Sequence, residues 1–364
     1  MSDSKSWGAS IREELGFISK ILIPIGFSIG KDQPHISGER FLMTKEKLVL
    51  VGERIADKKK VIIKISKHHN GQEEIRREKN IRDTLARVAF ASEVILLPDE
   101  IYFGGADGYL LWVSEFIEQD QVFATKPVEE QFFLSLNIFE MQEGFHANTF
   151  ENLRTVHGVF PIFNAETYIN SFSGFKEFVS KRLSDNPKII ETLSIAEDIL
   201  RSNKKVMEKY CGYLTHTDFA PANTRVSGRD IYMIDLSSVL FGNKYEGWAR
   251  FLNWALIHSP KLENLLMDYV RKNRGEEEYL CLRLMRIYQV GFLIKYYAGT
   301  LEKTSGDLHS LNQKRIKLWS YVLQSLLEDQ PISAKTLEEY RGERNQLRSK
   351  EETERQKEFN IPTL

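Results

Sequence analysis

Polar side chains gather at two points in the second half of the sequence, at a spacing that chemistry could use. His216, Asp218 and Asn223 lie within the stretch LTHTDFAPAN, and a short apolar run further on ends in Asp235. A loop that turns back on itself can bring an aspartate and a later asparagine to one site, and a strand can deliver another carboxylate from the opposite wall. Transfer of a phosphoryl group from ATP needs such a set. A carboxylate must stand near the acceptor hydroxyl, and oxygen ligands must hold Mg²⁺ on the β- and γ-phosphates.

Each of these residues also has an ordinary structural explanation. Asp218 and Asn223 are residue types favoured in turns, and Asp235, which Leu-Ser-Ser follows, could cap a helix. A lone histidine is more often structural than catalytic, so His216 is expected to hold the loop in place even at a reactive site. The combination of these residues with an apolar run ending at Asp235 favours the chemical interpretation.

A lysine in the first half of the sequence stands inside an aliphatic run. Residues 61–65 read VIIKI, and because side chains alternate along a strand, Lys64 shares a face with Ile62 and opposes the rest of the run. A charge in such a place is costly unless it has a partner. The next helical segment offers Glu78, which we favour, and Glu74 as the second choice. Lys64 could instead lie on the solvated face of an edge strand, but the downstream loop favours a partnered lysine.

These features resemble the aminoglycoside phosphotransferase and choline kinase family, a branch of the protein-kinase-like fold. The resemblance extends over residues from about 38 to 330. It implies a bilobal α+β fold, with a small antiparallel-sheet N-lobe and a larger, mostly helical C-lobe, and it implies ATP and Mg²⁺ as cofactors. By this resemblance Asp218 would be the catalytic base, Asn223 and Asp235 would bind Mg²⁺, and Lys64 would clamp the phosphates.

The same resemblance implies further nucleotide contacts. In kinases a helix glutamate partners the phosphate-binding lysine, and Glu78 would take that role. The segment Ser114-Glu115-Phe116-Ile117 would form the hinge, where the backbone of Glu115 and Ile117 pairs with adenine. The loop expected over the phosphates, around residues 43–47, contains no glycine, so the usual G-x-G-x-x-G is absent.

Other motifs separate the chain from eukaryotic-type protein kinases. Thr217 stands in place of the arginine of H-R-D, and in the branch that the chain resembles this position is commonly glycine. The metal-ligand motif reads Asp235-Leu236-Ser237 rather than D-F-G, and no A-P-E follows. The long helical stretch between Phe116 and His216 is typical of the small-molecule branch, where an inserted helical region helps to build the acceptor pocket.

Hydrophobic periodicity and turn residues indicate the elements that must position these groups. An amphipathic helix is expected over residues 8–29, ending near Pro24 and Gly26. The expected strands are 40–44, 48–51, 61–65, 101–103 and 109–116, the last two joined by a glycine-rich hairpin. The expected helices are 73–85, 128–147, 165–183, 187–209, 246–274, 276–302 and 311–328, with strand and loop between 214 and 239. A sheet followed by helices predicts an α+β protein in two lobes.

This order divides the chain into four expected parts. An N-terminal helix and linker occupy 1–37, a nucleotide-binding N-lobe 38–118, a helical C-lobe with the catalytic loop and acceptor site 119–330, and a charged helical or disordered tail 331–364. The N-terminal helix is expected to pack on the small lobe. The tail mixes lysine, arginine and glutamate with few apolar residues, which predicts a solvated segment without a chemical role.

Composition sets the broad class of the protein. With 364 residues, 42% of them hydrophobic, the balance is that of an ordinary globular protein. A net charge of -1 gives no global field that would attract nucleic acid or an anionic membrane, so neither is an expected partner. Cys211 and Cys281 have no metal-type spacing, and no signal-peptide pattern opens the chain, so a cytoplasmic location is expected. Nothing in the sequence indicates an oligomeric state.

Three functions compete on these observations. The favoured one is ATP-dependent transfer of a phosphate to a hydroxyl of a small molecule. The alternative is a catalytically silent, kinase-like module that binds nucleotide or regulates another protein. The glycine-free loop supports this alternative, and the retention of Lys64, Asp218, Asn223 and Asp235 opposes it. A kinase acting on a protein is the third possibility, which the missing activation-segment motif disfavours.

The acceptor is the least defined part of the prediction. Tyr245, Glu246, Trp248 and Trp254 follow the metal aspartate closely, where the acceptor site of the family tends to lie. Aromatic rings with a carboxylate would suit a cationic acceptor. Core positions are the favoured interpretation of the two tryptophans, so no substrate is assigned from them.

Overall fold

The computed structural model describes residues 3–31, 33, 46–88, 91, 94, 96–119, 121–228 and 230–350. The strand expected over 40–44 lies outside these residues, as does most of the glycine-free loop. None of the described helices is long and apolar enough to cross a membrane.

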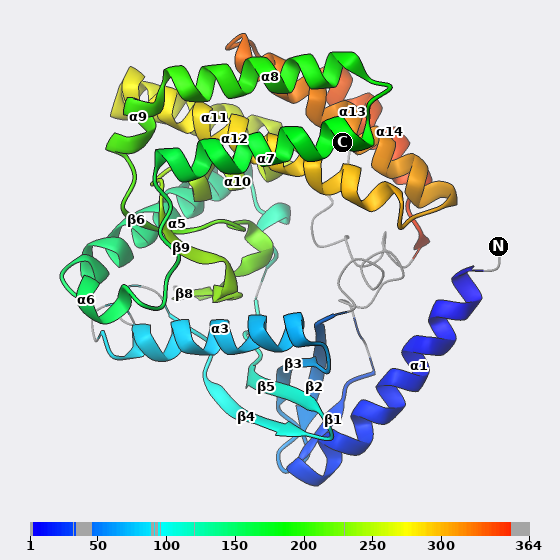
Figure 1. Ribbon diagram of the computed structural model, residues 1–364. Helices are drawn as coiled ribbons and strands as arrows, with labels where there is room; N and C mark the ends of the chain where they lie inside the picture. The colour runs from blue at the N-terminus through cyan, green and yellow to red at the C-terminus, as the bar shows by residue number, and fades with distance from the viewer. Residues whose placement is uncertain are drawn as a thin grey trace.

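The N-terminal part is built on one antiparallel sheet with the strand order β1-β2-β3-β5-β4. Its strands are β1 (Phe27–Ile29), β2 (Leu48–Arg54), β3 (Lys60–Ser66), β4 (Glu100–Ala106) and β5 (Tyr109–Glu115). Two helices accompany it, α1 (Asp3–Leu22) and α3 (His69–Ala86). Figure 1 shows α1 running beside the sheet and α3 lying between the sheet and the helical part.

The side chains of β3 point alternately to the two faces of the sheet, which explains why a lysine lies on one face. Val61, Ile63 and Ile65 are at most 1% exposed and pack into a small core with Ile18 and Leu22 of α1. Lys64 lies on the other face, as the alternation predicts. The N-terminal helix therefore packs on one face of this sheet, as expected. The other face of the sheet carries Lys64.

The expected helix over 8–29 is wrong at its end. Helix α1 stops at Leu22, and a single 3₁₀ turn (Ile23–Ile25) leads into Gly26, whose φ of 88° lies in the left-handed region. Glycine adopts that region without steric cost, and Pro24 has no N–H to continue a helical ladder. The chain thus reverses there, and β1 pairs with β2 as an edge strand of the sheet.

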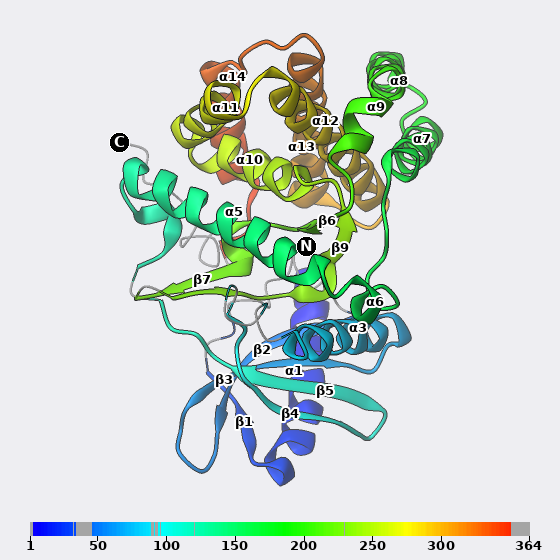
Figure 2. The same cartoon turned by 90° about the vertical axis from the view of Figure 1, so that its left-hand side faces the viewer.

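Helices make up most of the remaining chain. They are α5 (Val128–Phe150), α6 (Leu153–Val156), α7 (Ala165–Arg182), α8 (Pro187–Ser202), α9 (Lys204–Lys209), α10 (Glu246–His258), α11 (Pro260–Arg274), α12 (Glu276–Leu301), α13 (Gly306–Leu327) and α14 (Ala334–Leu347). Between α9 and α10 lie two strand pairs, β6 (Tyr213–His216) with β9 (Val239–Gly242) and β7 (Thr224–Ser227) with β8 (Asp230–Met233). Figure 2 shows these pairs between the sheet and the helices.

Two expected helices are each divided in two. The helix expected over 246–274 breaks at Ser259, because Pro260 cannot donate an N–H and instead opens α11 at its first position. The helix expected over 187–209 breaks at Asn203, whose side chain donates to the carbonyl of Ile199. The architecture is otherwise the predicted one: an α+β protein with a small antiparallel sheet and a larger, mostly helical part.

The last described helix is packed rather than solvated. Helix α14 lies against α13, and its Leu337 and Tyr340 are 3% and 6% exposed within the main helical core. The dense charge of this segment hid these apolar positions from composition alone. Residues 351–364 of the expected tail lie outside the described residues.

Candidate active site

A buried lysine–glutamate pair lies between the sheet and α3. Lys64 extends from β3, and its Nζ lies 2.6 and 2.5 Å from the two carboxylate oxygens of Glu78. The two side chains are 12% and 2% exposed, and Glu78 also accepts the N–H of Leu236 at 3.1 Å. Burial raises the pKa of Glu78, and the Lys64 ammonium opposes that rise. The structure thus pairs Lys64 with Glu78 rather than with Glu74, as expected.

Asp235 approaches this pair from the helical part of the protein. Its Oδ1 lies 3.9 Å from Lys64 Nζ and accepts the hydroxyl hydrogen of Ser237 at 2.7 Å. Burial favours a higher pKa, but the Lys64 and Lys47 ammonium groups outweigh it and hold the pKa of Asp235 well below its usual range. Asp235 is therefore ionised at neutral pH.

The backbone at Asp235 is unusual. Its φ of 61° lies in the left-handed region, which residues other than glycine rarely adopt and which recurs at functional sites. The side chain makes no capping hydrogen bond to the 3₁₀ turn that follows, Leu236–Ser238. The helix-cap explanation of this residue therefore does not hold, because the carboxylate is turned toward the lysines.

A second lysine faces the same carboxylates. Lys47 precedes β2, forms an ion pair with Glu74 and is only 12% exposed. Burial would lower its pKa, but Asp235 and Glu74 raise it, so Lys47 remains charged. Lys47 had no predicted role, since it stands at the end of a loop where exposed lysines are common. Its signal was its place just before β2, where Val49 pairs with Lys64 across the sheet.

The loop after β6 is held by a histidine and an asparagine. The backbone N–H of Asp218 donates to Nδ1 of His216 at 3.2 Å. The Nδ2 of Asn223 donates to the backbone carbonyl of Asp218 at 2.7 Å and to its carboxylate Oδ2 at 3.0 Å. His216 is 1% exposed, and burial lowers its pKa, so the neutral ring accepts the Asp218 N–H. This geometry suits the loop-holding role expected of His216.

An arginine that the sequence did not single out holds the other oxygen of the same carboxylate. Nε of Arg250 lies 2.8 Å from Oδ1 of Asp218, whose side chain is 48% exposed. Arg250 comes from α10, and the helical spacing of Glu246, Arg250 and Trp254 places them on one face of that helix. From that spacing, Arg250 could have been predicted to lie beside Glu246 and Trp254, which were already considered for the acceptor site.

Asn223 and Asp235 carry oxygen atoms of the kind that Mg²⁺ prefers. The N–H of Ile234 donates to the backbone carbonyl of Asn223 at 3.0 Å, which ties the loop to the residue before Asp235. Because Nδ2 of Asn223 donates its hydrogen bonds to Asp218, the Oδ1 of Asn223 remains as an acceptor. An amide oxygen and an ionised carboxylate suit a hard cation that also takes phosphate oxygens and water. Among the described residues, no group of three or more His, Cys, Asp or Glu side chains forms a metal cluster by itself.

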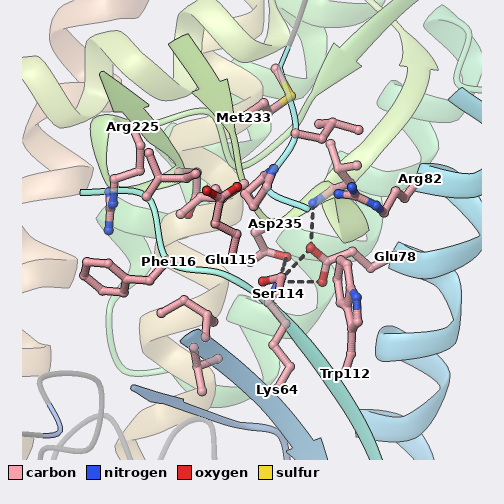
Figure 3. A pocket seen from close by; sticks show the side chains of 18 of the residues that line it. Lys64, Glu78, Arg82, Trp112, Ser114, Glu115, Phe116, Arg225, Met233 and Asp235 are labelled. Atoms are coloured by element: carbon pink, nitrogen blue, oxygen red, sulfur yellow. Dashed lines mark hydrogen bonds and ion pairs between the residues drawn. The ribbon is translucent and has the colours of Figure 1, made fainter. Parts of the chain in front are cut away.

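A cleft of about 160 Å³ is lined at one end by Lys64, Glu78 and Asp235. Figure 3 shows these three side chains meeting at one end, with the segment that carries Glu115 passing alongside. Ile117 also lines the cleft, and its backbone N–H has no hydrogen-bond partner among the described residues. The apolar lining includes Val49, Ile62, Leu97, Met233 and Leu236. The cleft between the sheet and the helical part therefore combines an apolar lining with a charged end.

A larger cavity of about 680 Å³ lies beside Asp218, among the helices. Trp254 and Glu246 line it, together with Asp218 and Arg250. Trp248 does not reach this cavity, because it is 1% exposed and stacks on a core phenylalanine. Both tryptophans near the expected acceptor site are therefore core residues, as favoured, and Trp254 also forms a wall of the cavity.

Comparisons of the sequence find no relatives: no protein-family model and no curated protein matches the chain. The structure, in contrast, is similar to solved aminoglycoside phosphotransferases. A thermostable mutant of aminoglycoside phosphotransferase APH(4)-Ia in its apo form has a TM-score of 0.62 at 12% identity, over 85% of this chain and 98% of that one.

Two ligand-bound structures are similar in the same way. A ternary complex of mutant APH(4)-Ia with ADP and hygromycin B has a TM-score of 0.60 at 12% identity, over 87% of this chain and 99% of that one. A GDP complex of an aminoglycoside 2'-phosphotransferase has a TM-score of 0.55 at 14% identity, over 82% and 98%. The likeness establishes the fold, which is the protein-kinase-like fold that the sequence predicted.

Proposed function

We propose that the protein is an ATP-dependent phosphotransferase whose acceptor is a hydroxyl group of a small molecule. One observation carries the proposal. The charged set formed by Lys64, Glu78 and Asp235 in one cleft is connected, through Asn223, to a carboxylate that faces a second cavity. Asn223 lines the first cavity, Asp218 lines the second, and a hydrogen bond joins the two side chains, which suits a donor nucleotide on one side and an acceptor on the other.

Each residue then has a defined task. Lys64, oriented by Glu78, neutralises the phosphates, and Asn223 and Asp235 hold Mg²⁺, which offsets charge on the transferring phosphoryl group. Asp218 accepts the proton of the attacking hydroxyl. The backbone of Glu115 and Ile117 pairs with the adenine ring. Lys47 adds a second cation near the phosphates, in a chain whose phosphate loop lacks glycine.

The similar structures support the general activity rather than the task of each residue. One of them was solved with ADP and hygromycin B together, so that fold accommodates a nucleotide and a polyhydroxylated molecule at once. The proposal transfers the nucleotide and the hydroxyl chemistry to this chain, and it does not transfer the aminoglycoside. A catalytically silent module would need neither Mg²⁺ ligands nor a carboxylate held at both oxygens, by Arg250 and Asn223.

Replacement of Asp218 by asparagine tests the proposal. Removal of a general base typically slows the chemical step by about 10²- to 10⁴-fold, whereas binding of MgATP should persist because Asp218 lies outside the nucleotide cleft. Turnover is measured as transfer of labelled phosphate from ATP to metabolites in a cell extract, and nucleotide binding is measured by calorimetry. The matched control is Asp268→Asn on α11, an exposed aspartate with a surface lysine partner.

Three outcomes decide between the candidate functions. Normal MgATP binding with a loss of transfer in the Asp218→Asn variant supports the phosphotransferase. Wild-type protein that binds MgATP but labels no metabolite supports the silent module. Labelling of added proteins rather than metabolites would support a protein kinase instead.

A further inference from the structure

The cavity beside Asp218 is rich in positive charge. Four arginine side chains line it, and the only carboxylates of the described lining residues are Asp218 and Glu246. The arginines are Arg250, Arg315, Arg344 and Arg348. They come from α10, α13, α14 and the segment after α14, so separate parts of the chain bring guanidinium groups to one space. Aromatic rings such as Trp254 and Tyr297 form further walls.

Arg344 is the most informative of these residues. It is 5% exposed, and among the described residues its side chain makes one hydrogen bond, from Nε to Oδ1 of Asn345 at 3.4 Å, and no ion pair. Burial, followed by the repulsion of Arg348 and its neighbours, lowers the pKa of Arg344 to about 10. A buried cation is costly unless an anion or good acceptors satisfy it. Arg344 therefore lines the cavity as a largely buried cation that forms no ion pair with any described carboxylate.

The two carboxylates of the cavity do not form ion pairs with Arg344, because both are held by other residues. Asp218 is held at Oδ1 by Arg250 and at Oδ2 by Asn223. Glu246 is 2% exposed and accepts hydrogen bonds from the hydroxyl of Tyr168 at 2.5 Å and from the amide of Gln289 at 3.0 Å. Burial raises the pKa of Glu246 to about 7, so its negative charge is incomplete at neutral pH. A polycationic aminoglycoside would meet repulsion in such a cavity.

We propose that the acceptor is an anionic hydroxyl compound, one that already carries a phosphate or a carboxylate, and that Arg344 binds this oxyanion while the hydroxyl faces Asp218. This inference rests on the proposed function and narrows its substrate class. Guanidinium groups pair with phosphate and carboxylate in a planar, two-pronged geometry, which makes arginine the fitting residue for either group.

The reaction is balanced without a further reactant. The acceptor oxygen forms a bond to the γ-phosphorus of ATP, and the bond from that phosphorus to the β–γ bridging oxygen breaks. ADP leaves with that oxygen, and the hydroxyl proton passes to Asp218 and then to solvent. The product carries one more phosphate than the acceptor, and the arginines also offset part of this added charge.

The acceptor class is tested by separating a metabolite extract into cationic, neutral and anionic fractions. Each fraction is incubated with the protein, Mg²⁺ and labelled ATP. Label in the anionic fraction is expected, and label confined to the cationic or neutral fraction would overturn the inference. If no fraction is labelled, the proposed function fails, and the binding measurement below still decides whether the cavity takes anions.

Binding is measured by calorimetry with the nucleotide cleft filled by a non-hydrolysable ATP analogue. Inorganic phosphate and malonate are the probes for the two oxyanions, and hygromycin B is the cationic probe. Phosphate or malonate should bind to the wild-type protein, and the one that binds more tightly identifies the oxyanion. Tighter binding of hygromycin B than of both anions would contradict the inference.

Arg344→Gln should weaken binding of the preferred anion by about tenfold or more, as expected for the loss of a hydrogen bond between charged partners. Arg344→Lys keeps the charge, so its affinity for the anion should fall between those of the wild type and of Arg344→Gln. The control Lys335→Gln removes an exposed charge from the same helix and should bind the anion as the wild type does. Thermal unfolding shows whether each variant folds, and a folded Arg344→Gln that binds as tightly as the wild type would refute the role of Arg344.

Discussion

Replacement of Lys64 by methionine separates two consequences of its position, one for nucleotide binding and one for folding. Methionine keeps the length of the side chain and removes the ammonium that faces Glu78 and Asp235. A hydrogen bond to a charged group contributes roughly 1.5–3 kcal/mol. Since 1.4 kcal/mol is about a factor of ten, the affinity for MgATP should fall by about ten- to a hundredfold.

The effect on folding should depend on pH. The variant leaves Glu78 2% exposed, without its ion-pair partner. Removal of one member of a buried pair costs about 3–5 kcal/mol when the other stays charged. Glu78 can instead bind a proton, because burial already raises its pKa. A raised carboxyl pKa favours the folded state below the unfolded pKa, and this contribution is lost as pH rises through the folded pKa. The stability deficit of Lys64→Met should therefore be largest at alkaline pH.

Urea unfolding at mildly acidic and mildly alkaline pH measures this deficit. The double variant Lys64→Met with Glu78→Leu removes both partners and should regain part of the lost stability, because the buried carboxylate that lost its partner is also gone. Its MgATP affinity should stay low. Lys60→Met, at an exposed position of the same strand, is the control and should change stability little. A pH-independent deficit that the double variant does not relieve would refute the buried pair.

Two other variants test the acceptor side. Arg250→Gln should lower kcat by about ten- to a hundredfold through misorientation of Asp218, with the KM for ATP unchanged, and steady-state kinetics with unchanged kcat would deny Arg250 a positioning role. Glu246→Gln removes a carboxyl whose pKa burial raises from 4.5 to about 7. The wild type should therefore lose about 3 kcal/mol relative to this variant as pH rises across that interval. Parallel stability profiles in urea unfolding would show that Glu246 titrates as an exposed group.

Local pattern was enough for much of the fold. The alternation around Lys64 correctly gave the buried face of β3, and the glycine-rich turn gave the β4–β5 hairpin. The errors lie where one residue decides the path of the chain. Gly26 ends the N-terminal helix and allows a strand to begin, and Pro260 divides a helix that hydrophobic periodicity alone would continue.

In the candidate site, too, local pattern predicts some contacts and not others. Asp218 and Asn223 could be related from the sequence because five positions in one loop fix their distance, and Glu78 because one helix follows β3. Helical spacing groups Arg250 with Glu246 and Trp254, but the contacts of Arg250 and Arg344 could not be predicted, because nothing in local spacing says which distant helix will face a given loop. Only the packing of α10 and α14 brings them to the cavity.

Helix α14 gives the architecture a practical consequence. The loop that carries Asp218 and Asn223 is encoded well upstream, whereas one wall of the large cavity belongs to the final described helix. Under the proposed function, substitutions in α14 would therefore change the choice of acceptor and leave the residues around the nucleotide as they are.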